Sequence, residues 1–367
     1  MAPTLRLLAD DLTGALDTAA EFVGLVGPVH AFWQGARPGI LPINAAIDTG
    51  TRETDEATAR AVVSEASAAL AGATLAYKKV DSLIRGQTLP ELAACYVTGA
   101  WQHAVLAPAF PFQGRVTRQG QQFVAAGGGW TPVGPLLVDA LRALGLPANA
   151  GTPGTPLTPG ITVFDAETDA DLDAVVAAVE SDANVLWCGT GGLARALAGG
   201  HTQPAHPSLP GPVLGLFGSD QSVTAAQLAA CGVHWTALPH GGPASGAYLA
   251  EQLRRHGIAL ASLDLPTGLS RAAAALRIGR ELHALTTHLP RPGTLVVAGG
   301  ETLRGLCIAL GAESLVVQGR AVPGVPVSCI NGGAWDGVTV VSKSGAFGHP
   351  TLLRELLRLP DPERTAS

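Results

Sequence analysis

The chain has 367 residues, of which 47% are hydrophobic and 14% are charged, and its formal net charge is −6. That length predicts two domains with substantial cores, and an acidic chain lacks the basic face of proteins that bind nucleic acids or anionic membranes. Five scattered cysteines without a CxxC pair favour reduced thiols over a disulfide framework or a zinc site.

Short apolar runs alternate with Ala-rich helical patterns along most of the chain. A first strand at 5–9 runs into a helix that begins after Asp11. Further strands are predicted at 45–47, 75–80, 104–107, 161–164, 185–188, 213–217, 294–298, 315–317 and 339–341. Further helices are predicted at 55–71, 88–98, 134–144, 168–181, 190–198, 222–231, 244–256, 269–288, 302–310 and 350–358. This alternation is typical of α/β proteins, so we predict two domains, each a mainly parallel sheet flanked by helices, with a cleft between them.

A segment rich in Gly and Pro separates the two halves of the chain. GGHTQPAHPSLPGP, residues 199–212, lacks periodicity and is interpreted as an interdomain linker. It divides the chain into an N-terminal domain at 1–205 and a C-terminal domain at 211–360, followed by a loose tail at 361–367. Segment 145–160 is predicted to be a low-complexity surface loop. We recognise no signal peptide and no apolar run of ~20 residues, so a cytoplasmic protein is expected.

The first candidate site is LLADDLTGALD. Asp10 and Asp11 stand at the carboxyl end of the first strand, where ligands bind in open α/β sheets. Asp11 alone is explained equally well as a helix N-cap. Gly14 early in the helix is unfavourable by up to about 1 kcal/mol, so we expect it to let another group approach the backbone. Asp17 follows near this end of the helix and is a further ligand-facing candidate.

The second candidate site is YKKVDSLIRGQ. Strand alternation places Lys79 and Asp81 on one face and Lys78 on the other, with Ser82 and Arg85 in the turn. Arginine binds a carboxylate through two hydrogen bonds, and aspartate accepts hydrogen bonds from hydroxyls. The pattern therefore favours a small hydroxylated anion, although a surface ion-pair cluster remains the alternative. Only three of the 23 basic residues are lysines, two of them here and the third at Lys343, which favours specific roles for a compact ammonium.

The third candidate site is LAPAFPFQGRVTRQGQQF, residues 106–123. Two prolines after a predicted strand indicate an ordered, extended loop. Arg115 follows Gly114 in that loop and is the better candidate for an anion contact than Arg118.

Three similar strand-to-turn junctions occur in the second half: GSDQSVT, GGET and KSGAFG. Gly and Ser or Thr at helix N-termini leave backbone amides free to bind phosphate oxygens. The junctions predict a nucleotide site, with ordinary tight turns as the alternative, and no Walker A sequence is present. The candidate residues are Ser219, Ser222, Gly299, Gly300, Glu301, Thr302, Lys343 and Gly345.

A competing pattern is GTGGLA, in which Gly189, Gly191 and Ala194 have the spacing of a dinucleotide-binding fingerprint. The acidic residue expected about 20 positions later is missing, since the next acid is Asp220 beyond the linker. An NAD-dependent oxidoreductase acting on a small hydroxy acid is therefore retained as an alternative.

Taken together, these segments resemble the signatures of the four-carbon acid sugar kinase family. The matching stretches are ADDLTGALD, KKVDSLIRG, PAFPFQGRVTRQG, GSDQSVTAAQ, GGET and KSGAFG. They stand in the family's order and are spread from residue 9 to residue 348. Leu16, Leu83, Glu301 and Ala346 differ from the residues usual in the family.

The resemblance implies an N-terminal domain for the acid sugar and a C-terminal domain for ATP. The implied reaction is phosphoryl transfer from ATP to a hydroxyl of a tetronate or 3-oxo-tetronate. By position, the sugar site would comprise Asp10, Asp11, Lys79, Asp81, Ser82, Arg85 and Arg115, and the nucleotide would be held by Ser219, Gly299, Gly300, Thr302 and Gly345.

Phosphoryl transfer to a hydroxyl calls for a nearby carboxylate, because the hydroxyl loses its proton as it attacks. Asp11 is the first candidate for this base and Asp10 or Asp81 the next. Because adjacent carboxylates repel each other, the pKa of one of them is expected to rise.

The cationic residues Lys79, Arg85 and Arg115 are expected to bind the carboxylate of the substrate. Mg²⁺ is expected to bridge the ATP phosphates, with no protein ligand assigned to it. The expected partners are thus an acid sugar and ATP, with neither nucleic acid nor membrane, and a homo-oligomer is left open. The departures from the family pattern keep a non-catalytic, ligand-binding relative as a further alternative.

Overall fold

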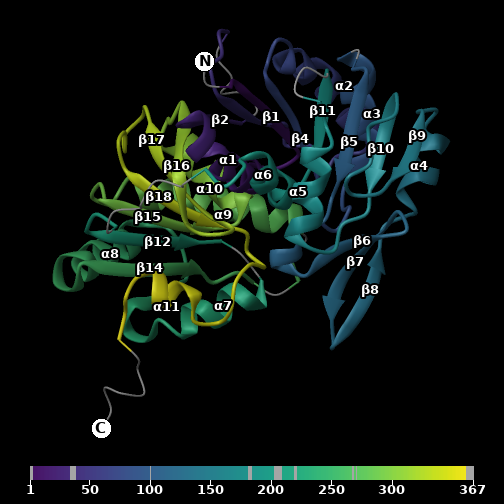
Figure 1. Cartoon of the computed structure of the whole chain (residues 1–367). Coiled ribbons are helices and arrows are strands. Elements are labelled where there is room, and N and C mark those ends of the chain that lie inside the picture. Colours follow the sequence, from purple (N-terminus) through teal and green to yellow (C-terminus); the bar gives the residue numbers. More distant parts are fainter. Residues whose placement is uncertain are drawn as a thin grey trace. The chain divides into compact units, whose positions relative to one another are not determined.

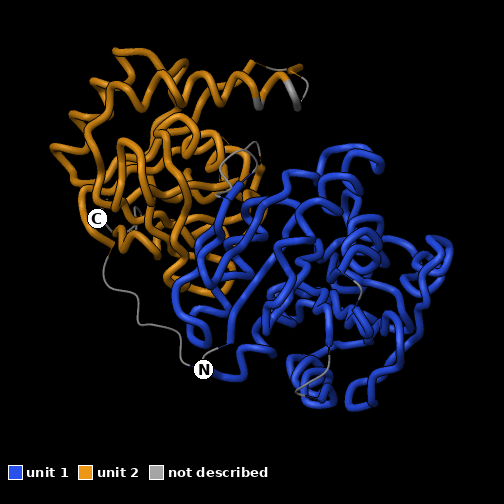
Figure 2. Tube along the Cα trace, turned by 90° about the horizontal axis from the view of Figure 1, so that it is seen from above, with its two compact units in different colours: residues 1–204 blue, residues 205–367 orange. Residues whose placement is uncertain are grey.

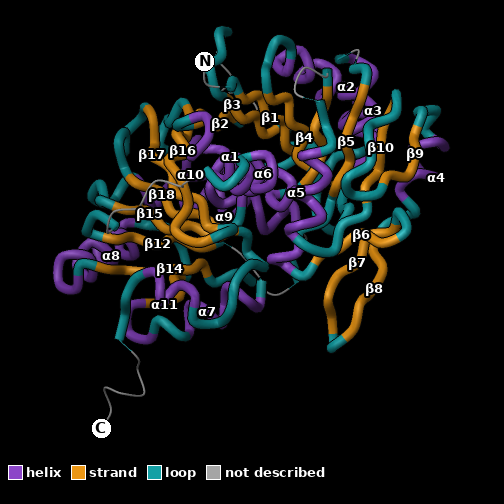
Figure 3. The backbone as a smooth tube through the Cα atoms, viewed as in Figure 1, coloured by secondary structure: helices purple, strands orange, loops and turns teal. Residues whose placement is uncertain are grey.

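The computed structural model describes residues 3–33, 39–99, 101–180, 184–201, 209–218, 221–266, 268–269 and 271–360. The chain divides into two compact units, residues 1–204 and 205–367, which Figure 2 distinguishes by colour. Helices and strands alternate within each unit (Figure 3), so the predicted α/β class is confirmed. Most of the expected linker, 202–208, and the tail at 361–367 lie outside the described residues. The helices described are all too short or too polar to cross a membrane.

The first unit contains an extended parallel sheet with helices on its faces (Figure 1). Its elements are β1 (Leu5–Ala9), α1 (Leu12–Val26), β2 (Val29–Phe32), β3 (Ala45–Asp48), α2 (Glu56–Ser67), β4 (Leu75–Lys79), α3 (Thr88–Thr98), β5 (His103–Ala107), β6 (Arg115–Arg118), β7 (Gln121–Ala126), β8 (Gly129–Val133), α4 (Leu137–Ala143), β9 (Ala148–Gly151), β10 (Gly160–Phe164), α5 (Asp169–Ala177), β11 (Val185–Gly189) and α6 (Gly191–Leu197). Short 3₁₀ turns occupy Ala68–Leu70 and Pro111–Gln113.

Strand order brings the ends of β3, β1 and β4 together. The parallel sheet runs β2-β3-β1-β4-β11-β5-β10-β9. Its central strands are buried on both faces, as their continuous apolar runs predict. Because parallel strands end at one edge of the sheet, the residues that follow β3, β1 and β4 are neighbours there.

Strand β2 was not predicted, and two segments predicted to be loops contain strands. The expected extended loop at 106–123 ends in β6 and β7, which form an antiparallel ribbon with β8. The polar residues of this ribbon hide the alternation on which a strand prediction depends. The expected surface loop at 145–160 contains β9, which pairs with β10 at the edge of the parallel sheet.

The second unit is also built on a mainly parallel sheet. Its elements are β12 (Val213–Phe217), α7 (Ser222–Ala229), a 3₁₀ turn (Gly232–His234), β13 (Trp235–Leu238), α8 (Pro243–His256), β14 (Ile258–Leu263), α9 (Arg271–Thr286), β15 (Thr294–Ala298), α10 (Gly300–Ala309), β16 (Ser314–Val322), β17 (Val325–Asn331), β18 (Thr339–Lys343) and α11 (Leu352–Leu356). Strands β13-β14-β12-β15-β18 are parallel, whereas β17 pairs antiparallel with both β18 and β16.

Strands β13 and β14 were not predicted from the sequence, and neither was β17. It contains Pro326, and a proline within a run normally argues against a strand. Pro326 is tolerated because its partner strand β16 is irregular there, with register shifts at Val317/Gly319 and Arg320/Val322.

Candidate active site

Asp10 and Asp11 follow β1 directly. Asp10 is buried, with 3% of its surface exposed. Asp11 is the N-cap of α1, and its Oδ1 accepts a hydrogen bond of 2.8 Å from the amide of Gly14. The interpretation of Asp11 as a helix cap is therefore confirmed, but capping engages only one of its oxygens. The other oxygen of Asp11 and both oxygens of Asp10 bind a single arginine.

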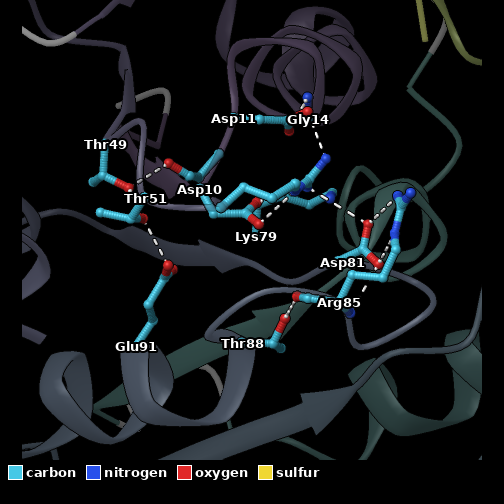
Figure 4. A network of polar contacts seen from close by, with 12 residues as sticks. Asp10, Asp11, Gly14, Thr49, Thr51, Lys79, Asp81, Arg85, Thr88 and Glu91 are labelled. Carbon is cyan, nitrogen blue, oxygen red and sulfur yellow. Dashed lines mark hydrogen bonds and ion pairs between the residues drawn. The ribbon is translucent and has the colours of Figure 1, made fainter. Parts of the chain in front are cut away.

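That arginine is Arg52, in the turn after β3. Its Nε and one terminal nitrogen donate to the two oxygens of Asp10, each at 2.8 Å, and its other terminal nitrogen donates to Asp11 Oδ2 at 2.6 Å. A terminal nitrogen also lies 3.5 Å from Asp81 Oδ1. One guanidinium thus joins three carboxylates from the ends of β1 and β4, which Figure 4 draws with their contacts.

The two neighbouring aspartates differ in their proton affinity. Burial raises the pKa of Asp10, but the charge and hydrogen bonds of Arg52 outweigh burial and hold that pKa below its ordinary value. Burial also raises the pKa of Asp11; Arg52 opposes that rise, the adjacent Asp10 charge adds to it, and the pKa ends above its ordinary value. The pair therefore separates into one firmly ionised carboxylate and one that accepts a proton more readily.

Asp81 and Arg85 form a second ion pair beside Arg52. Arg85 donates from Nε and a terminal nitrogen to the two oxygens of Asp81, at 2.9 and 2.7 Å, and the amides of Leu83 and Arg85 add two more hydrogen bonds. Burial raises the pKa of Asp81, but these donors and Arg52 outweigh it and lower that pKa well below its ordinary value. Ile84, in this turn, has φ 56°, a strained conformation for a β-branched residue. Such strain is frequent at functional sites.

Lys79 lies between this cluster and the start of α1. A Cβ on Gly14 would stand 3.0 Å from Lys79 Nζ and 2.6 Å from Asp11 Oδ1. The group that approaches the helix backbone, as the early glycine predicts, is therefore the Lys79 ammonium. Lys79 is buried, and its charge acts on Asp10, Asp11 and Asp81. Its carbonyl accepts a hydrogen bond from Lys78 Nζ at 3.1 Å, but its own ammonium donates no hydrogen bond to the described residues.

The other predicted sugar-site residues are placed less uniformly. Burial lowers the pKa of Arg115, and the charges of Asp81 and Arg85 have smaller effects on it. The Nε of Arg115 is buried without a hydrogen-bond partner. Ser82 lies in the same turn as Asp81, and its carbonyl accepts a hydrogen bond from Gln122. Asp17 instead faces the start of α6, where its Oδ2 is 3.7 Å from the position of a Cβ on Gly191.

The dinucleotide-like glycines at the start of α6 are packed against protein. A Cβ on Gly189 would meet Leu193 at 2.6 Å, and one on Gly191 would meet the ring of Phe110 at 3.0 Å. The Thr190 hydroxyl donates to the carbonyl of Ala109 at 2.7 Å. The space that a pyrophosphate would need is thus filled, and these glycines allow close packing of helix on strand. This removes the support for an NAD-dependent oxidoreductase.

The glycine turns of the second unit meet at one sheet edge, because β12, β15 and β18 are consecutive parallel strands. Gly299 is the N-cap of α10 at φ 97°, and its amide donates to the carbonyl of Lys343 at 2.9 Å. The buried Thr302 places its Oγ1 2.8 Å from where a Cβ on Gly218 would lie. In the described part of the chain no side chain caps α10, so its first amides, beginning at Gly300, remain available to an anion.

Lys343 is a buried cation at this edge, with 2% of its surface exposed. Its ammonium donates to the carbonyl of Ser344 at 2.9 Å and to Thr224 Oγ1 at 3.3 Å, and burial lowers its pKa to about 8. Thr224 in turn donates to the carbonyl of Gly345 at 2.7 Å, which ties α7 to the turn after β18. Among the described residues this ammonium has no carboxylate partner.

The remaining nucleotide candidates are more exposed or lie outside the described residues. Ser222 begins α7 and is exposed. Glu301 is exposed and binds Arg304 through both carboxylate oxygens, each at 2.6 Å. Ser219 and Asp220 are outside the described residues.

Sequence reasoning missed Arg52. It lies in DTGTR, directly after the strand predicted at 45–47, and that position was the available signal, because this strand ends at the same sheet edge as β1. It also missed Glu91, which binds Lys78 on the face of β4 opposite Lys79.

Comparison with known proteins gives two domain matches that together span most of the chain. A sugar-binding N-terminal domain matches residues 5–158, and a nucleotide-binding C-terminal domain matches residues 214–353. A D-threonate kinase of Cupriavidus necator is 32% identical, with 95% of each chain covered, and a D-threonate kinase of Bordetella bronchiseptica is 31% identical, with 96% of each covered. A solved structure from Salmonella typhimurium LT2 has the same fold, with a TM-score of 0.73 at 22% identity over 96% of this chain and 98% of that one.

Proposed function

The chain belongs to the four-carbon acid sugar kinase family, and from this premise we propose that it transfers the terminal phosphoryl group of ATP to a hydroxyl of a tetronate. D-Threonate is the first candidate substrate, because the two relatives described above are D-threonate kinases. The site residues of the first unit would bind the acid sugar, and the glycine turns of the second would bind the nucleotide.

The observation that carries the proposal is the environment of Asp11. Its carboxylate is oriented by the Gly14 amide on one oxygen and by Arg52 on the other. A carboxylate has about four lone-pair positions, so these two bonds leave room for a substrate hydroxyl. Its raised pKa suits a general base, which must accept the hydroxyl proton as the oxygen attacks phosphorus.

The substrate carboxylate would bind to the cations that lack a full set of partners. The Lys79 ammonium donates no hydrogen bond to the described residues, and Arg115 has a buried Nε without a hydrogen-bond partner. Arg52 and Arg85 are already held by Asp10 and Asp81 and would mainly fix those aspartates. Asp10 and Asp81, both with lowered pKa values, would remain ionised and accept hydrogen bonds from the polyol.

The phosphates would bind at the edge formed by β12, β15 and β18. The first amides of α10, beginning at Gly300, and the turn around Gly299 offer hydrogen-bond donors to phosphate oxygens. Lys343 would supply a compact positive charge to the same group. Binding a phosphate would give its buried ammonium the counter-charge that the described residues lack.

Mg²⁺ would enter together with ATP, where it neutralises charge on the phosphates. The described residues contain no group of three His, Cys, Asp or Glu side chains arranged to hold a metal ion. Glu301, the acid closest in sequence to the phosphate turn, is engaged by Arg304. We therefore assign Mg²⁺ no protein ligand.

The proposal is tested by a coupled ADP-release assay over threonates, erythronates and their 3-oxo forms. The expected result is saturable ADP release with at least one tetronate and none without an acid sugar. Thermal-shift measurements with ATP–Mg²⁺ and with each tetronate run in parallel. Ligand-dependent stabilisation without ADP release from any substrate would contradict the kinase and favour the non-catalytic relative.

A further inference from the structure

A buried ion pair lies close to Asp10. One of its members is Lys78, whose charge lowers the pKa of Asp10. Lys78 Nζ and Glu91 Oε2 are 2.7 Å apart, and their side chains are 1% and 0% exposed. The two residues come from β4 and α3. Replacing a buried ion pair by apolar residues is often neutral or stabilising, so stability alone is a weak reason for its presence.

The second oxygen of Glu91 connects this pair to the aspartates. Glu91 Oε1 accepts a hydrogen bond of 2.6 Å from the Thr51 hydroxyl (Figure 4). Thr51 immediately precedes Arg52, and the amides of Thr51 and Arg52 donate to the carbonyl of Asp10 at 3.1 and 3.3 Å. The turn that carries Arg52 is therefore anchored at two places. The Thr51 hydroxyl binds Glu91 of α3, and the amides of Thr51 and Arg52 bind the carbonyl of Asp10 after β1.

The position of Arg52 depends on that anchored turn. Arginine has one of the most flexible side chains, and fixing such a side chain costs about 1.5–2 kcal/mol of rotamer freedom. Holding the backbone of residues 51–52 against Glu91 and Asp10 reduces the positions from which the guanidinium can reach Asp11. A turn released from Glu91 would let Arg52 keep its two-point contact with Asp10 while losing its single bond to Asp11.

We propose that Thr51 and Glu91 are positioning residues for phosphoryl transfer: they hold Arg52 on Asp11 and thereby set the orientation of the catalytic base. Lys78 balances the charge of Glu91 in the interior. This inference rests on the proposed function, because it assumes that Asp11 is the base. The groups that act on the Asp11 carboxylate are Arg52 from the turn after β3, Asp10 from the end of β1, Lys79 from β4, Arg85 from the turn after β4 and the Gly14 amide of α1.

The test compares Thr51→Val, which keeps the shape but removes the hydroxyl, with Thr51→Ser, which restores it. Thr51→Val is expected to lower kcat on the order of 10²-fold, as for a small misplacement of a catalytic group, with KM for ATP unchanged. The acid limb of the kcat/KM profile is expected to move to higher pH, because the Arg52 charge that lowers the pKa of Asp11 is held less firmly. Thr51→Ser is expected to retain most of the activity and the original pH profile.

A matched control removes a similar hydrogen bond away from the site. The Thr58 hydroxyl donates to Asp55 Oδ2 at 2.8 Å on the exposed start of α2. Thr58→Val is expected to leave kcat and the pH profile unchanged. If Thr51→Val folds and has the kcat and pH profile of the wild type, the inference is wrong.

An activity-independent measurement separates this inference from the proposed function. In protein labelled with carbon-13 at the aspartate carboxyls, the Asp11 signal is assigned by its loss in Asp11→Asn and then titrated. The expected result is a higher Asp11 pKa in Thr51→Val than in wild type and Thr51→Ser. If the wild type releases no ADP with any tetronate, the proposed function fails while this titration still decides the positioning role. If the wild type is active and the Asp11 pKa is the same in the wild type, Thr51→Val and Thr51→Ser, the positioning inference is wrong while the proposed function stands.

Discussion

Asp11 combines a structural and a chemical task at the first turn of α1. As N-cap it binds the Gly14 amide, and through its second oxygen it binds Arg52. Asn also caps helices well, but an amide cannot take up a proton from an attacking hydroxyl. Exchanging Asp11 for Asn therefore separates the two tasks.

We predict that Asp11→Asn lowers kcat by about 10²–10⁴-fold, the usual contribution of a general base. Nucleotide affinity and the midpoint of thermal unfolding should change little, because the cap is kept. Steady-state kinetics, calorimetric titration with an ATP analogue and thermal unfolding measure the three quantities.

Asp55 provides a control for this substitution, since it is the exposed N-cap of α2 and accepts from the Thr58 amide at 3.0 Å. Asp55→Asn should leave kcat unaffected.

In the wild type, kcat/KM should fall as pH falls through the raised pKa of Asp11, because the protonated form cannot act as a base. An Asp11→Asn enzyme with near-normal kcat would contradict the assignment of the base.

Lys343 should reduce stability in the absence of nucleotide. Its pKa is lowered by burial to about 8, so below pH 8 the folded protein carries an ammonium that burial disfavours. Lys343→Met should raise the free energy of unfolding at pH 7 by about 1–3 kcal/mol, since each pKa unit corresponds to about 1.4 kcal/mol and two hydrogen bonds are lost. The same variant should bind ATP much more weakly.

The pH dependence distinguishes this explanation from improved packing. Because the folded-state pKa of Lys343 is depressed, the unfolded state binds more protons between about pH 8 and pH 10.5, so the wild type gains stability as pH rises through that window. Denaturant unfolding at pH 7 and pH 10 should show the advantage of Lys343→Met shrinking at the higher pH. A variant less stable than wild type at pH 7 would contradict the argument.

At the scale of single elements, α1 is specialised by a glycine in its first turn. Gly14→Ala would improve helix propensity by about 0.5–1 kcal/mol, yet its Cβ would meet Asp11 Oδ1 at 2.6 Å and Lys79 Nζ at 3.0 Å. We predict that the collision dominates, lowering kcat on the order of 10²-fold through displacement of Asp11. Kinetics and thermal unfolding of the purified variant measure both effects.

Gly279 in α9 is the matched control, because a Cβ there would meet nothing within 4 Å. Gly279→Ala should leave activity unchanged and stabilise the protein by about 0.5–1 kcal/mol. Equal and harmless effects of both substitutions would show that Gly14 is not needed for close approach.

The elements were largely predictable because their hydrophobic patterns are regular. Strands β1, β12 and β15 and helix α3 have the bounds expected from the sequence. The ribbon β6–β8 and strand β17 were missed, since polar residues, Pro326 and the irregular pairing of β16 obscure their period. The hydrophobic pattern of a segment indicates which of its faces is buried. It does not indicate whether the neighbouring strand is irregular enough to accept a proline.

The candidate site was predictable where its residues follow a predicted strand in a recognisable motif, and not where strand order alone brings a residue to the site. Asp10, Asp11, Lys79 and Asp81 stand beside strand ends in the sequence. Arg52 is 42 residues from Asp10, and it joins the site because β3 and β1 are neighbours in the sheet. A single sequence specifies such a neighbour only once strand order is known.

At the scale of the whole molecule, each unit concentrates its distinctive polar groups at the carboxyl edge of its own parallel sheet. In the first unit these are carboxylates paired with arginines, and in the second they are glycine turns around a buried lysine. The chemistry of the groups differs accordingly: hydroxyl and carboxylate recognition in one, phosphate recognition in the other. The two ligand affinities should therefore be separable by mutation.

Gly299→Ala tests this separation. Gly299 has φ 97°, a conformation that costs an L-residue about 1–3 kcal/mol, and relief of that strain would turn the peptide that begins α10. ATP affinity should fall by about 10- to 100-fold, as 1–3 kcal/mol implies, while tetronate affinity stays unchanged. Gly257, the C-cap of α8 at φ 70° in the same unit, provides the control, since Gly257→Ala carries similar strain away from the phosphate turns. Calorimetric titration of both variants with an ATP analogue and with D-threonate distinguishes local from global effects. If Gly299→Ala loses affinity for both ligands, binding is not divided between the units. A loss of ATP affinity in Gly257→Ala would contradict that division as well.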